Sequence, residues 1–195
     1  MSYFYYDGEN LKCEDLEIDS INQTVETPFY CYSLNSLKEN INKYKVNLKN
    51  TRSKVCFSLK SNSNLKIIEL IAQEGLGADV VSLGEFHKAL KAGIKGENIV
   101  FSGVGKTVSE IEFAIKNNCF QINAESISEI KKINEISGDL NIIQNIGIRN
   151  NKCRALNHLL YICVLRNEMG TIEFLRIFKY QVFLVFFKNI RVVRD

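Results

Sequence analysis

The segment Val55-Cys56-Phe57-Ser58-Leu59-Lys60-Ser61-Asn62-Ser63-Asn64 decides how this chain is interpreted. Its first half is mostly apolar and predicts a buried strand, and Lys60 stands where that strand gives way to a polar turn. In a β/α barrel the reactive groups lie at the carboxyl ends of the strands. A partly desolvated lysine at such a place is a candidate for covalent chemistry with an aldehyde cofactor. The competing interpretation of this segment alone is a strand-end lysine that faces solvent.

Short apolar runs alternate with longer amphipathic runs on both sides of this segment. Predicted strands cover residues 29–32, 54–59, 78–81, 98–101, 120–123 and 140–148. Predicted helices cover residues 34–46, 64–74, 84–92, 107–117 and 126–136. About six strand-then-helix units with short loops predict an α/β fold with parallel strands and crossover helices. A repeat of about 20–25 residues suits a (β/α)8 barrel of the TIM type better than a doubly wound sheet.

Two of the predicted helices start with a Ser-x-x-Glu pattern that is typical of a capping box. The pairs are Ser36 with Glu39 and Ser126 with Glu129. Six strands cannot close an eight-stranded barrel, so we expect unpaired backbone groups on the first and last strands unless other residues cover them.

The regular pattern ends near Arg149. Residues 1–149 carry 17 basic and 19 acidic side chains, whereas residues 150–195 carry 8 basic and 3 acidic ones. The segment 151–195 has neither clean strand nor clean helix periodicity, and a single long helix from about 155 to 185 is one interpretation of it. We expect a divergent tail that arose through a shifted reading frame or gene decay; the alternative is a genuine short form.

Composition limits the class of protein. With 46% apolar and 24% charged residues the chain fits a soluble globular protein, and a net charge of +3 gives little reason to expect nucleic acid. The six cysteines show no C-x-x-C spacing, so neither a metal site nor a disulfide framework is indicated. No signal peptide is visible and the apolar run 178–187 is too short to span a bilayer, so we expect no membrane association and a cytoplasmic location.

Polar side chains follow successive predicted strands, at positions that would share the carboxyl-end rim of a parallel barrel. Each one alone is explained by helix capping or by a solvated loop, but their joint placement favours a site. They are Lys60, Asp79, Ser82, Ser102, Lys106, Asn123, Glu125 and Arg149.

The chain resembles the diaminopimelate decarboxylases, pyridoxal-phosphate enzymes of the alanine-racemase-like fold type. The family's patterns T-P-x-Y-V-Y, Y-A-V-K-A-N-S-N and G-A-D-V-V-S-x-G-E resemble Thr27 to Tyr32, Cys56 to Asn64 and Gly77 to Glu85. Ile99 to Thr107 and Asn123 to Ser126 extend the resemblance in the same order. It covers residues 1–149 and includes Tyr6 to Asp15 near the start.

The resemblance implies a fold, a cofactor and an activity. Residues 1–28 would belong to the family's β-domain, 29–149 to a truncated pyridoxal-phosphate-binding barrel, and 150–195 to the divergent tail. The implied reaction is decarboxylation of meso-2,6-diaminopimelate to L-lysine, by a family whose members are homodimers. Lys60 would bind the cofactor covalently, Arg149 would lie near its ring, and Asp79 and Glu85 would belong to the cofactor site and its support.

The sequence departs from the family after Arg149, where Asn150-Asn151-Lys152-Cys153 replaces the expected I-R-x-N-P continuation. The family's phosphate-binding loop and its acidic partner for the pyridine nitrogen are not recognisable beyond this point. Three alternatives therefore stay open beside an active enzyme: a non-catalytic remnant, a pyridoxal-phosphate-binding protein, and a related ornithine or carboxynorspermidine decarboxylase.

Overall fold

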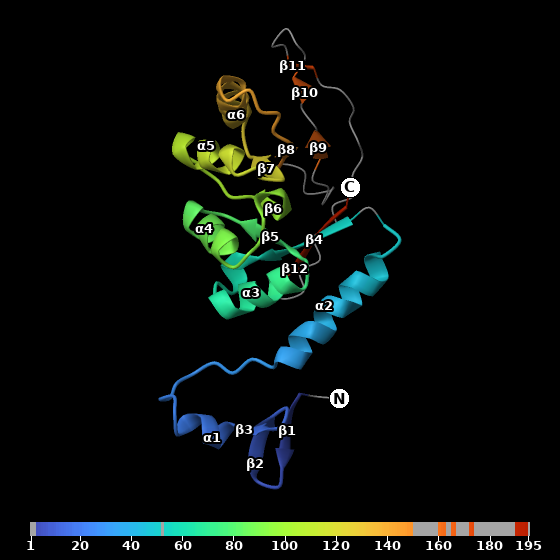
Figure 1. Cartoon of the computed structure of the whole chain (residues 1–195), viewed down its shortest axis with the longest axis vertical. Helices are drawn as coiled ribbons and strands as arrows, with labels where there is room; N and C mark the ends of the chain where they lie inside the picture. The colour runs from blue at the N-terminus through green and yellow to red at the C-terminus, as the bar shows by residue number, and fades with distance from the viewer. Residues whose placement is uncertain are drawn as a thin grey trace. The chain divides into compact units, whose positions relative to one another are not determined.

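A computed structural model describes residues 3–51 and 53–149, together with the backbone of the segments 160–162, 165–166, 172–173 and 190–194. The chain divides into two compact units, Met1–Asn50 and Thr51–Asp195 (Figure 1). No helix in the described part of the chain combines the length and the apolar character that crossing a membrane requires.

The first unit combines a small antiparallel sheet with two helices. The sheet has the order β1-β2-β3. Its strands are β1 (Phe4–Asp7), β2 (Asn10–Cys13) and β3 (Leu16–Glu17). The helices are α1 (Ile18–Asn22) and α2 (Leu34–Leu48). The β1–β2 turn contains Gly8 with φ 63°, a left-handed conformation that glycine adopts without steric cost.

Two predictions for the first unit are wrong. Residues 29–32 form no strand, because a strand needs a neighbour's backbone groups and the sheet position beside the strand 53–58 is taken by residues 190–194. The cap of α2 is Ser33 rather than Ser36, since the Ser33 hydroxyl accepts a 3.0 Å hydrogen bond from the Ser36 N–H. Glu39 instead pairs with Lys43.

The second unit is built on a parallel sheet with helices along one face (Figure 1). Its parallel strands are β4 (Ser53–Ser58), β5 (Gly77–Val80), β6 (Ile99–Phe101), β7 (Gln121–Ala124) and β8 (Ile146–Ile148). The connecting helices are α3 (Leu65–Gln73), α4 (Leu83–Lys91), α5 (Val108–Lys116) and α6 (Ile127–Asp139). The predicted α/β fold with consecutive parallel strands is confirmed, with five parallel strands instead of six.

An apolar layer between helices and sheet explains why the strand-helix units pack. Phe86 of α4 makes edge-to-face contacts with Phe101 of β6 and Phe113 of α5, at centroid distances of 5.9 and 5.5 Å. Such aromatic pairs contribute about 0.5–1.5 kcal/mol each beyond the burial of their area. Ile68 and Ile111 are also fully buried. The helix-period pattern of the sequence therefore marks the faces that make the core.

The last predicted strand is shorter than expected. Helix α6 continues to Asp139, and β8 covers only Ile146–Ile148 of the predicted 140–148. Asn141 adopts φ 53°, a left-handed turn conformation that Asn tolerates and that ends the helix. The apolar residues within 140–145 favour a strand in the sequence, but the turn at Asn141 separates them from the sheet.

Both edges of the parallel sheet are paired with strands from the tail. β12 (Ile190–Arg194) runs antiparallel to β4, and β9 (Leu160–Ile162) runs antiparallel to β8. β10 (Leu165–Arg166) and β11 (Ile172–Glu173) form a separate antiparallel pair. The prediction of a single helix from 155 to 185 is therefore wrong. The unpaired backbone groups at the edge of β8 form hydrogen bonds with a strand of this segment instead. The apolar run 178–187 lies outside the described residues.

Three of the helices begin with the same device, a Ser or Thr cap followed three residues later by Glu. The cap hydroxyl accepts the N–H of that glutamate in each case: Ser82 with Glu85, Thr107 with Glu110, and Ser126 with Glu129. Only the Thr107 pair is a complete capping box. The box predicted at Ser126 is half formed, because the Glu129 carboxylate accepts instead from the Glu125 N–H at 2.7 Å.

Close packing at Gly96 gives a first testable prediction. A Cβ at this position would overlap the backbone carbonyl oxygen of Asn117. We expect Gly96→Ala to lower the free energy of unfolding by about 1–3 kcal/mol, as over-packing typically does. The matched control is Gly84→Ala in α4, where the nearest atom would be 3.9 Å away and the change removes the entropic cost of glycine in a helix. Urea unfolding of both variants measures the difference; equal midpoints would contradict the prediction.

Candidate functional site

A chain of hydrogen bonds joins buried polar side chains from four neighbouring strands or their carboxyl ends. Asp79 of β5 accepts from the Ser58 hydroxyl through Oδ2 at 3.2 Å and from the Ser102 hydroxyl through Oδ1 at 2.5 Å. Asn123 of β7 donates to Ser102 Oγ at 2.8 Å and accepts from Gln121 at 2.7 Å. All five residues are less than 10% exposed. The Asp79 carboxyl is therefore fixed in orientation by its neighbours on both sides.

Lys60 lies beside this network, directly after β4. It sits in a 3-10 helix of one turn, Leu59–Ser61. Leu59 is fully buried, and the Ser61 hydroxyl donates to the Ser58 carbonyl at 2.5 Å. The Lys60 side chain is exposed and makes no hydrogen bond or ion pair with another described residue. No described residue therefore competes for its amine, and the anchored turn limits where it can reach.

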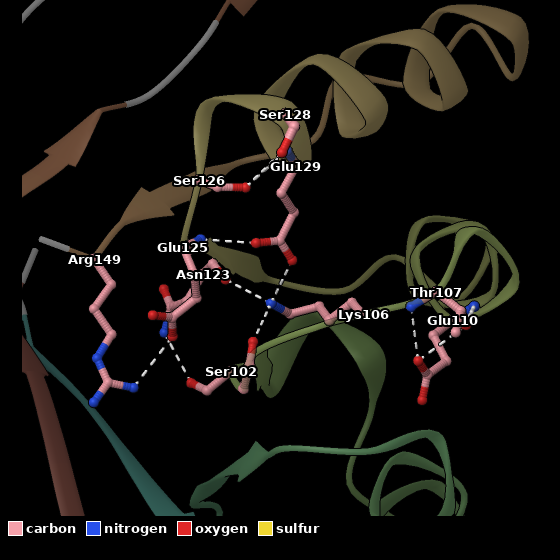
Figure 2. Close-up of polar contacts among 11 residues, drawn as sticks. Ser102, Lys106, Thr107, Glu110, Asn123, Glu125, Ser126, Ser128, Glu129 and Arg149 are labelled. Atoms are coloured by element: carbon pink, nitrogen blue, oxygen red, sulfur yellow. Dashed lines mark hydrogen bonds and ion pairs between the residues drawn. The ribbon is translucent and has the colours of Figure 1, made fainter. Parts of the chain in front are cut away.

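Lys106 has the opposite environment. Its side chain is 2% exposed, and its ammonium donates to the carbonyls of Gly103 and Asn123 at 2.7 Å each and to Glu129 Oε1 at 2.8 Å. These three acceptors satisfy all three donors of an ammonium group. Figure 2 shows this lysine between the loop after β6, the end of β7 and the start of α6. Its role is therefore structural.

Arg149 and Glu125 form an ion pair at the same rim (Figure 2). Arg149 Nη1 lies 3.2 Å from Glu125 Oε1, with 40% of the arginine side chain and 10% of the glutamate side chain exposed. The Arg149 N–H also donates to the Ala124 carbonyl at 2.9 Å, which holds the backbone after β8 against the end of β7. The guanidinium is therefore positioned but still reaches solvent.

Glu85 and Glu110 support helix starts in the same region. The Glu85 carboxylate accepts the Val81 N–H at 2.8 Å. Glu110 accepts the N–H groups of Thr107 at 2.9 Å and Leu83 at 3.3 Å, and the Thr107 N–H foremost holds the pKa of Glu110 below its usual value. Through Leu83, Glu110 ties α5 to the start of α4.

The residues predicted for this rim lie at or after the ends of neighbouring strands, but their hydrogen-bond partners were not predicted. Lys60 and Asp79 follow or end adjacent strands as expected. Ser58 and Gln121 were missed as members of the network, and so was the pair of Lys106 with Glu129. Residues two apart in a strand face the same side, so the positions of Gln121 and Asn123 carried a usable signal for part of the network.

Comparisons with known proteins identify the family. The family model described as pyridoxal-dependent decarboxylase, pyridoxal binding domain, matches residues 34–159. The diaminopimelate decarboxylase of Helicobacter pylori strain J99 is 48% identical over 133 residues, which are 68% of this chain and 33% of the relative. That of Aquifex aeolicus is 40% identical over 147 residues, 75% of this chain and 34% of the relative. The chain thus spans about a third of the length of the curated relatives it matches.

Solved structures agree with this result. The crystal structure of diaminopimelate decarboxylase from Helicobacter pylori complexed with L-lysine has a TM-score of 0.65 at 47% identity, covering 68% of this chain and 34% of that one. The enzyme from M. jannaschii in co-complex with L-lysine has a TM-score of 0.70 at 32% identity, covering 75% and 35%.

The donor set fits part of the family's cofactor, pyridoxal phosphate. An exposed amine suits its aldehyde, and Lys60 provides one that has no partner among the residues the structure describes. Asp79 provides a carboxyl that two hydroxyl groups hold in place, and Arg149 provides a guanidinium at the same rim. Both groups suit the polar atoms of the cofactor's pyridine ring. The family model covers well over half of the chain, and the chain belongs to the pyridoxal-dependent decarboxylases, of which it carries the pyridoxal-binding domain region.

Proposed function

We propose that this chain is the lysine-bearing part of a diaminopimelate decarboxylase, which acts on meso-2,6-diaminopimelate to form L-lysine. The observation that carries the proposal is Lys60, an exposed amine without a described partner at the carboxyl end of β4. It stands two residues after Ser58, which bonds Asp79. The relatives above are named diaminopimelate decarboxylases, which favours this substrate over ornithine or carboxynorspermidine.

Each rim residue has a role in this proposal. Lys60 binds the cofactor aldehyde and moves a proton at the substrate α-carbon, Asp79 and Arg149 lie against the cofactor, and Glu85 supports the site by fixing the loop after β5. When bound, pyridoxal phosphate spreads the negative charge that loss of carbon dioxide leaves on the α-carbon. The hydroxyl groups of Ser58 and Ser102 keep the Asp79 carboxyl in one orientation, which is what a preorganised polar site requires.

The proposal includes the organisation of the chain and its surroundings. Residues 1–28 belong with the β-domain of the family, 29–149 form the partial barrel, and 150–195 are a divergent tail. The partner is a small amino-acid substrate, with no nucleic acid, in the cytoplasm. A homodimer of the kind the family forms is not expected for this chain.

Covalent labelling tests the role of Lys60. Purified chain is mixed with pyridoxal phosphate, reduced with borohydride and mapped by peptide mass spectrometry. We expect the label on Lys60, because its amine has no described partner, and we expect Lys106 to stay unlabelled, because its three protons are held by acceptors. The Lys60→Ala variant should lose the label.

Exposed lysines provide the internal control. Lys66 is 86% exposed and pairs with Glu69 on the surface of α3, so it reports random reaction of a surface amine with the aldehyde. Labelling of Lys60 should exceed that of Lys66 and saturate with the cofactor. A label on Lys106, or equal labelling of Lys60 and Lys66, would overturn the assignment.

A further inference from the structure

Two cysteines of the first unit lie in contact although they are far apart in the sequence. Cys13 is the last residue of β2 and is 6% exposed, while Cys31 precedes α2 and is partly exposed. The Cys31 thiol is near enough to Cys13 to contribute to the raised pKa of the Cys13 thiol. Both are free thiols. Neither takes part in the site at the rim of the parallel sheet, which belongs to the second unit.

Glu14 holds the two chain segments together at this point. Its Oε1 accepts hydrogen bonds from the Ser33 hydroxyl at 2.6 Å and from the Asn35 N–H at 2.9 Å, and its Oε2 accepts from the Asn35 side chain at 2.7 Å. Glu14 follows Cys13 directly, and Ser33 comes two residues after Cys31. Three hydrogen bonds therefore hold the residue after Cys13 against the segment that follows Cys31.

The two thiols differ in reactivity. Burial, followed by the nearby Cys31 thiol, raises the pKa of Cys13 to about 11, so this thiol is protonated at neutral pH. Cys31 is the more exposed of the two, and an attacking reagent meets it first. This is the arrangement of an accessible attacking thiol next to a protected resolving thiol.

We propose that Cys13 and Cys31 form a reversible disulfide by exchange with a small disulfide such as glutathione disulfide. The Cys31 thiolate attacks one sulfur of glutathione disulfide, and one glutathione leaves as thiolate. The Cys13 sulfur then gives up its proton and attacks the Cys31 sulfur, and the second glutathione leaves. Two protein thiols are oxidised, one glutathione disulfide is reduced to two thiols, and the protons go to the released glutathione.

The bond would close a loop that contains β3 and α1 and that connects the small sheet to α2. Closing a loop restricts the unfolded chain, so the oxidised first unit should resist unfolding better than the reduced one. In a reducing compartment the pair stays open. The proposal makes this loop the part of the chain that responds to oxidation, independently of cofactor binding.

Peptide mapping of the full chain tests the bond directly. The protein is incubated with glutathione disulfide, free thiols are blocked, and trypsin is added. No lysine or arginine lies between Cys13 and Lys38, so both cysteines fall in the tryptic peptide 13–38. We expect this peptide unblocked and lighter by two hydrogen atoms. Cleavage after Glu17 or Glu26 should leave two fragments that separate only after reduction.

Variants distinguish this bond from other products. Cys13→Ser should trap the mixed disulfide of Cys31 with glutathione, and Cys31→Ser should lose both the mixed and the internal disulfide. Cys119→Ser is the matched control, because Cys119 is buried with its pKa raised to about 12 and should not matter. Wild-type protein in urea should lose the preference for the internal bond. Stable glutathione adducts on wild-type Cys31, or bonds from Cys13 or Cys31 to Cys153 or Cys163, would overturn the proposal.

Discussion

Lys106→Met should lower the free energy of unfolding by about 3–5 kcal/mol, the range found when one partner of a buried ion pair is removed. The substitution keeps an unbranched side chain, one atom shorter, but leaves the Glu129 carboxylate, 10% exposed, without its cation. It also leaves the carbonyls of Gly103 and Asn123 without this donor. The loss falls on three segments at once, because this lysine joins the loop after β6 to β7 and α6.

A matched control on α5 separates the effect of losing a buried ion pair from the effect of losing a positive charge on the surface. Lys116 pairs with Glu112 at 2.6 Å, but the two side chains are 54% and 42% exposed. Lys116→Met should cost no more than about 0.5 kcal/mol, as exposed pairs do. Urea unfolding of the three proteins measures both effects. The double change of Lys106→Met with Glu129→Leu should recover part of the loss, and a single Lys106→Met as stable as wild type would contradict the structural role.

The isolated 195-residue chain should release no measurable carbon dioxide from meso-diaminopimelate with pyridoxal phosphate present. Decarboxylation needs the lysine, a held phosphate, a charge partner for the ring nitrogen and a site for the substrate carboxylate. The described rim provides Lys60, Asp79 and Arg149, while the chain spans about a third of its relatives. Each missing electrostatic group typically costs on the order of 10²–10³ in rate.

Release of carbon dioxide from carboxyl-labelled substrate measures this directly, with a full-length relative as positive control. Turnover that disappears in Lys60→Ala would refute the prediction and would mean that the tail completes the site. The outcome is separate from the labelling experiment, since Lys60 can bind the cofactor in a chain that does not turn over.

Local signals explain why most of the fold was predictable. The helices α4, α5 and α6 are capped by Ser82, Thr107 and Ser126. Both the caps and the apolar periodicity depend on residues close in the sequence, so they can be recognised without knowledge of the fold. One of the failures depends on a distant partner. Whether residues 29–32 form a strand depends on what pairs with β4, and that position is taken by β12, more than 130 residues later in the chain.

The candidate site also combines features that neighbouring residues determine with features that distant residues determine. The position of Lys60 after an apolar run could be read from the sequence, because strand ends carry the reactive groups in this kind of fold. The bonds of Asp79 to Ser58 and Ser102 could not, because they depend on the register of β4, β5 and β6. The sequence singled out Lys60 over Lys106 because Lys60 follows an apolar run directly, but the three acceptors that hold the Lys106 ammonium could not be read from it.

The glutamates at the third position of α4, α5 and α6 have a consequence for motion at the rim. Each binds a backbone N–H of the loop before its helix, at Val81, Thr107 and Glu125. Helix α3 differs, because its cap is Asn64 and its third residue is Ile67, which offers no carboxylate. Three of the four loops are thus held by a carboxylate of the helix that follows. The turn with Lys60 is held instead by the buried Leu59 and by hydrogen bonds to the Ser58 carbonyl and the Asn62 side chain. Motion of the backbone next to this lysine is therefore limited by neutral contacts, whereas a glutamate limits it at the other three loops.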